Sequence, residues 1–129
     1  MVDMIGDGSW WVLVETSVGG DSRWELVHTI PVDGGREGAV DRAAQLARTC
    51  SDSGFEANEP EAYGRRVFRT AETGWLVEVG RSSWPKDMKS PITLKTHLRI
   101  TVGELEHESE TPVTQPPAKS RLRRALGGS

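Results

Sequence analysis

The sequence predicts an α+β fold: a mainly antiparallel sheet of about five strands in the order β-β-α-β-β-β, one covering helix and a flexible C-terminal tail. Three observations support this prediction. Most of the strand-like segments are joined by short turns, only one segment has a clear helical pattern, and residues 92–102 alternate between apolar and polar side chains. The length of 129 residues suits a single domain.

The first two strands are expected at residues 10–18 and 24–32, which are rich in β-branched residues, Leu and Trp. Turn-forming residues separate them at 19–23. Because side chains alternate along a strand, a five-residue loop would place Trp24 and Leu26 on the same face as Val12 and Val14. The opposite face would then hold Trp11, Leu13 and Val27.

Residues 36–50 predict the helix, because they contain no proline and four alanines. One stripe of this helix is apolar, and its small side chains would allow close packing on a sheet. The stripe consists of Val40, Ala43, Ala44 and Ala47, with Ala39, Leu46 and Cys50 on its border. Residues 51–54 end the helix, and Gly54 suits a left-handed backbone conformation.

A second hairpin is expected from residues 65–71 and 75–81, around Glu72-Thr73-Gly74. Either a two- or a four-residue loop gives the same faces, with Phe68 on the face of Trp75. The two-residue register would place Arg69 opposite Glu78 as a cross-strand ion pair. Residues 92–102 predict the last strand, with one buried and one solvated face. The spacing of Thr101 and Glu104 resembles a capping box, so a short helix is expected after that strand.

These elements divide the chain into a flexible N-terminus at 1–9, one α+β domain at 10–108, and a Pro-containing linker with a basic disordered tail at 109–129. No apolar run approaches the roughly 20 residues of a membrane-spanning helix. No secretory signal is visible, and the lone Cys50 cannot form an internal disulfide. We therefore expect a cytoplasmic protein.

Motifs for catalysis, cofactors or metal ions are absent from the sequence. Cys50 lies at the end of the helix, where the helix dipole opposes a thiolate, and is expected to be a buried structural residue. His107 has acidic neighbours but no metal-binding spacing. We expect no enzyme, no cofactor and no metal. The alternative is an enzyme of unknown type that uses His28, expected beside Val14, or His97 on the polar face of the last strand.

Charge is divided unevenly along the chain. The formal net charge is −3, but the four cations Lys119, Arg121, Arg123 and Arg124 leave 12 basic and 19 acidic residues, or −7, in residues 1–118. A body of that charge would repel a phosphate backbone, which disfavours nucleic-acid binding. Nucleic-acid binding is kept as an alternative function. The candidate contacts are cations on the second hairpin and in the tail: Arg65, Arg69, Arg121, Arg123 and Arg124.

The favoured interpretation is a non-enzymatic protein-interaction or regulatory module, with an unknown protein partner or a homodimer and no membrane contact. Trp11 and Trp84 are the candidate anchors, since large aromatic side chains often dominate interfaces. Trp11 is expected on a partly polar face, and Trp84 lies in a loop bounded by prolines.

Three segments carry a resemblance: TIPVDGGREGAVDRAAQLAR at 29–48, RRVFRTAETGWLVEV at 65–79 and THLRITVGELE at 96–106. Together they resemble small uncharacterised proteins of high-GC actinobacteria over about residues 10–106. The resemblance implies no known activity and supplies no catalytic residues.

Overall fold

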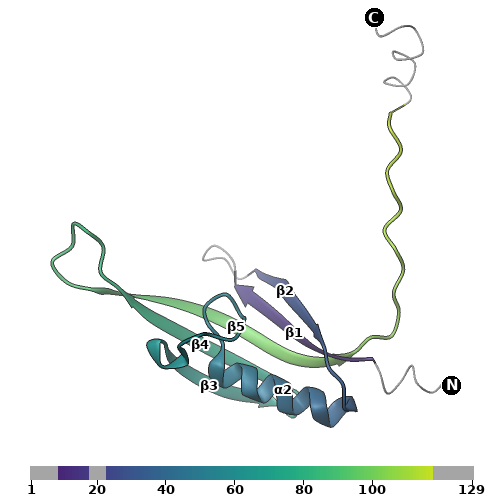
Figure 1. Cartoon of the computed structure of the whole chain (residues 1–129), viewed down its shortest axis with the longest axis horizontal. Helices are drawn as coiled ribbons and strands as arrows, with labels where there is room; N and C mark the ends of the chain where they lie inside the picture. The colour runs from purple at the N-terminus through teal and green to yellow at the C-terminus, as the bar shows by residue number, and fades with distance from the viewer. Residues whose placement is uncertain (1–8, 18–22, 118–129) are drawn as a thin grey trace, which may run out of the picture.

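Five strands and one α-helix form the fold in the computed structural model, which describes residues 9–17 and 23–117 (Figure 1). In chain order the elements are β1 (Trp10–Ser17), β2 (Trp24–Pro31), α2 (Gly35–Thr49), the 3-10 helix η1 (Pro60–Ala62), β3 (Gly64–Ala71), β4 (Gly74–Ser83) and β5 (Ile92–Glu104). The sheet order is β2-β1-β5-β4-β3, and every neighbouring pair is antiparallel. The predicted α+β fold with one helix is therefore confirmed.

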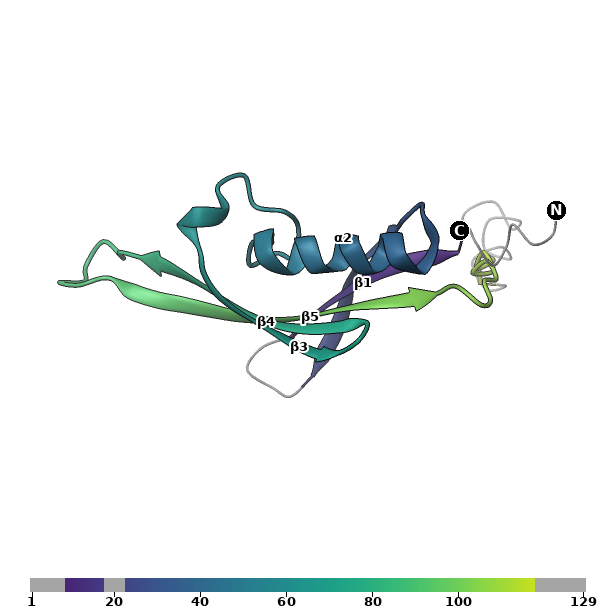
Figure 2. The ribbon, with the colours of Figure 1, turned by 90° about the horizontal axis from the view of Figure 1, so that it is seen from below.

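Helix α2 lies along one face of the sheet, as Figure 2 shows from the side. The core lies between them, where fully buried side chains of β1, β4 and β5 meet Ala43, Leu46 and Ala47. Ala39 is also fully buried, whereas Val40 and Ala44, predicted at the centre of the stripe, are only partly buried. The apolar stripe is thus rotated slightly toward its predicted border, and its alanines allow the helix to approach the sheet closely.

A β-bulge in β2 reverses the predicted faces of Trp24 and Leu26. Val14 pairs with His28, but Glu15 pairs with Leu26, so Val27 is an extra residue in β2. Each extra residue shifts the alternation by one position. His28 lies beside Val14 as predicted, whereas Trp24 and Leu26 lie on the face away from α2, and their predicted placement is wrong.

A second bulge changes the face assignment of β3 in the same way. Arg69 pairs with Trp75 and Ala71 pairs with Gly74, so Thr70 is the extra residue. The predicted Arg69–Glu78 pair is therefore wrong, because Arg66 lies opposite Glu78. Phe68 consequently lies on the face away from α2 rather than beside Trp75.

Strand β5 is longer than predicted at its C-terminal end. Glu104 of β5 pairs with Trp10 of β1, and the N–H of the next residue, Leu105, donates to the Ser9 carbonyl. The short helix predicted after Thr101 does not form, because these backbone groups are already used by the sheet. Residues 105–117 contain neither helix nor strand.

The other end of β5 extends past the helix together with β4 (Figure 1). Leu98 and Ile100 are fully buried, while Ile92 and Leu94 are 37% and 41% exposed. The predicted buried face of β5 is therefore buried only where α2 covers it. The loop at residues 84–91, called the hairpin tip below, joins β4 to β5 at this projecting end.

Gly54 lies in the turn after α2 and packs closely against the first hairpin. Its φ of 91° is left-handed, and an added Cβ would lie 3.0 Å from Val14 Cγ1 and 3.1 Å from His28 Cδ2. We expect Gly54→Ala to lower the free energy of unfolding by about 2–4 kcal/mol, through backbone strain and steric overlap. Urea denaturation measures this change.

Gly35→Ala is the matched control, because Gly35 has a φ of 69° and an added Cβ would meet nothing within 4 Å. It should lose only the backbone contribution, about 1–2 kcal/mol. Equal losses for the two variants would contradict the packing role of Gly54.

Candidate functional site

The sheet surface opposite α2 carries an unusual number of large apolar side chains. The register places six of them on this surface, called the open face below: Trp11, Leu13, Trp24, Leu26, Phe68 and Leu76. Leu26 and Phe68 are 54% and 48% exposed. The solvated face of an antiparallel sheet is commonly polar, so these side chains need an explanation beyond folding.

Two clusters of charged side chains on the open face are paired across strands. Arg66 donates from Nε to Glu78 Oε1 over 3.1 Å, and His97 Nε2 lies 3.2 Å from Glu78 Oε2. Arg99 Nε lies 3.5 Å from Glu15 Oε1, and its guanidinium stacks 4.2 Å from the centre of the Trp24 ring. Hydrogen bonds from Arg66 and then His97 hold the pKa of Glu78 below its ordinary value.

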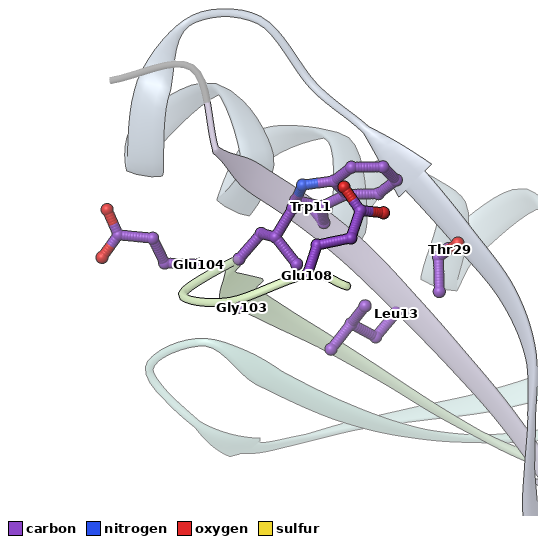
Figure 3. A pocket seen from close by; sticks show the side chains of 7 residues that line it. Trp11, Leu13, Thr29, Gly103, Glu104 and Glu108 are labelled. Atoms are coloured by element: carbon purple, nitrogen blue, oxygen red, sulfur yellow. The ribbon is translucent and has the colours of Figure 1, made fainter. Parts of the chain in front are cut away.

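An apolar groove lies at the end of the open face near the start of β1. Its volume is about 290 Å³, and it is lined by Trp11, Leu13, Thr29, Gly103, Glu104, Leu105 and Glu108. Figure 3 shows Trp11, Leu13 and Thr29 from β1 and β2, with Glu104 and Glu108 from the end of β5 and the segment that follows it. The groove thus combines an apolar floor with carboxylates at its side.

The two candidate anchors lie far from each other. Trp84 is 64% exposed in the hairpin tip, as its loop position predicted, and its Nε1 donates to the Met88 carbonyl over 2.9 Å. Trp11 pairs with Gly103, whereas β5 at the hairpin tip begins at Ile92. These β5 positions are eleven residues apart, about 36 Å along the strand. The structure therefore does not bring Trp11 and Trp84 into one site.

The candidate cations have separate environments. Arg65 donates from Nη1 to the Cys50 carbonyl (2.7 Å) and from Nη2 to the Pro60 carbonyl (2.9 Å), which ties the end of α2 to η1. Arg69 donates to the Glu72 carbonyl and stacks on Trp75. Arg121, Arg123 and Arg124 lie outside the described residues. Anion or nucleic-acid contact by these five residues stays a prediction.

Both histidines of the enzyme alternative have protein partners. His28 Nε2 lies 2.8 Å from the Ser53 carbonyl oxygen, and its ring packs against Phe55 with centroids 3.6 Å apart. His97 belongs to the Glu78 pair on the open face. Cys50 is fully buried, and this burial raises the pKa of its thiol, which disfavours the thiolate.

Within residues 9–17 and 23–117, no group of three or more His, Cys, Asp or Glu is placed to hold a metal ion. No helix in the same residues has both the length and the apolar character to cross a membrane.

Comparison of the chain with family models, curated proteins and solved structures found no match. Sequence reasoning placed Trp11 and Leu13 on the open face but missed Trp24, Leu26, Phe68 and Leu76 as parts of it. Two of its exposed members, Leu26 and Phe68, lie there because of the bulges, which no motif in the sequence marks.

The Glu78 cluster gives a measurable electrostatic signature. We expect the Glu78 carboxyl to titrate below the ordinary glutamate range, and Arg66→Leu to move its pKa back up, because the strongest hydrogen bond to it is lost. Carbon-detected NMR titration of the side-chain carboxyl measures both values.

The sign of the pH effect follows from the same shift. A pKa lowered by folding stabilises the fold at pH values above the pKa of the unfolded carboxyl, and this contribution disappears as the pH falls through the folded-state pKa. Glu56→Gln is the control variant and should leave the Glu78 pKa unchanged, because Glu56 pairs with Arg42 away from this cluster. An unchanged Glu78 pKa in Arg66→Leu would contradict the assignment.

Proposed function

We propose that this chain is a non-enzymatic protein-interaction module that binds a partner protein through its open face. The observation that carries the proposal is a set of six large apolar side chains on a sheet face that no helix or strand of the described residues covers. Leu26 and Phe68 are the exposed members of the set, and the other four are half-buried. Exposed apolar surface of this kind is typical of protein interfaces.

The composition of the open face supports a protein as the partner. Interface cores are enriched in aromatic residues and Arg, and the open face combines Trp11, Trp24 and Phe68 with Arg66 and Arg99. Trp and Arg are also the residue types that most often dominate binding energy.

Ion pairing on the open face further supports this choice. Arg66 and Arg99 each have an acidic partner within the sheet, so a partner surface can cover them without leaving an isolated charge. Phosphate groups of a nucleic acid would have to compete with Glu78 and Glu15 for the same cations. A protein partner is therefore favoured over a nucleic acid.

Cytoplasmic location is part of the proposal. Cys50 is a free, buried thiol, and free thiols are common in proteins of reducing compartments.

Site-specific photo-crosslinking in the native cells tests the proposal. A photoreactive amino acid replaces Leu26 or Phe68 on the open face, or Gln45, which is exposed on α2, as the matched control. We expect both open-face positions to capture the same protein, at least ~10-fold more efficiently than position 45, because the partner contacts the sheet.

Two results would overturn the proposal. One is the absence of any protein adduct from both open-face positions, and the other is equal capture from Gln45. Adducts with nucleic acid that diminish steeply as salt is raised would instead favour the nucleic-acid alternative.

A further inference from the structure

Two features at opposite ends of the sheet are complementary to each other. The hairpin tip presents Trp84 as an exposed aromatic knob, with Met88 beside it at 46% exposure. The other end holds the apolar groove beside Trp11, which has side chains of β1, β2 and the segment after β5 around it.

The size and chemistry of the groove suit one large side chain. Its volume of about 290 Å³ is at the lower end of the range for ligand pockets, and Trp11, Leu13 and Leu105 form its apolar lining. Trp84 can enter such a groove at low cost, because its indole N–H already donates to the Met88 carbonyl. No buried donor would be left without a partner, and the ring is already held in place before binding.

Charges at the two ends are opposite in sign. The hairpin from Gly80 to Lys95 carries four cations against Asp87, a formal charge of +3. Arg81 is paired with Asp52 over 2.9 Å, so Lys86, Lys89 and Lys95 carry the excess of positive charge. Residues 104–110 beside the groove carry four glutamates and no Lys or Arg, a formal charge of −4. Glu104 and Glu108 line the groove itself. Charge complementarity of this kind orients two surfaces and excludes the reversed arrangement.

The knob cannot reach the groove of its own chain. The two ends are separated by about 36 Å along β5, which is one continuous strand through the sheet. We propose that Trp84 of one copy docks in the apolar groove of a second copy, with Lys86 and Lys89 facing Glu104 and Glu108. This inference rests on the proposed function, since it names a second copy as the protein that occupies one end of the open face.

The predicted contact is heterologous, because it joins two different surfaces. A copy that uses only its knob leaves its groove free, so association builds an open head-to-tail chain unless the contacts close into a ring or two copies exchange knobs reciprocally. A contact made by one aromatic residue and a few charges is small, and its association is correspondingly weak and sensitive to salt.

Charge reversal on each side provides the test, using the full chain and sedimentation velocity over micromolar to millimolar concentrations. We expect the average mass of the wild-type protein to rise with concentration. Lys86→Glu with Lys89→Glu, and separately Glu104→Lys with Glu108→Lys, should each weaken association by ~10-fold or more, because like charges then face each other. An equimolar mixture of the two variants should associate again, since each knob then meets a groove of opposite charge.

Two further variants separate docking from general effects of charge or folding. Glu37→Lys with Asp41→Lys makes the same change of charge on the exposed side of α2 and should leave association unchanged. Trp84→Ala removes an exposed side chain outside the core, so it should stay folded by circular dichroism and lose ~10-fold or more in association.

A wild-type chain that stays monomeric over the whole concentration range would overturn head-to-tail docking. So would charge-reversed variants that associate as strongly as wild type, or a mixture that fails to recover association. If the chain is monomeric while Leu26 and Phe68 still crosslink to another protein, self-docking fails and the proposed function stands. If self-docking is observed without any such adduct, the proposed partner binding fails instead.

Discussion

The packing of a single helix on one face of a five-stranded sheet determines the rest of this molecule. Ala43 and Ala47 bring α2 close to the sheet, and buried side chains of β1, β4 and β5 complete the core on that side. These are four valines with Trp75, Leu98 and Ile100. No second α-helix lies among the described residues to cover the opposite face. None of the six large apolar side chains of the open face belongs to the buried core cluster.

Much of the fold could be predicted from local patterns. The strand alternation at 92–102, the alanine-rich segment at 36–50 and the turn at Glu72-Thr73-Gly74 each correspond to an observed element. These patterns depend on neighbouring residues and on secondary-structure periodicity, which a single sequence contains. The capping-box prediction at Thr101 was wrong because a long-range contact, the pairing of β5 with β1, used the same backbone groups.

The candidate site was less predictable, and the two bulges are the physical reason. One extra residue at Val27 or Thr70 moves every side chain beyond it to the other face of the sheet. Turn residues constrain the length of a loop but not a bulge inside the strand. The exposure of Trp84, in contrast, could be predicted from the sequence, because Trp84 lies in a loop that contains Pro85 and Pro91.

The same bulges have a consequence for unwanted aggregation. In the sheet order β2-β1-β5-β4-β3, the two outer strands are β2 and β3, and each contains one of the extra residues. A bulge interrupts the regular row of backbone donors and acceptors that an outer strand offers, so another chain cannot easily extend the sheet there. The irregular outer strands therefore make the backbone of this sheet a poor template for amyloid-like growth.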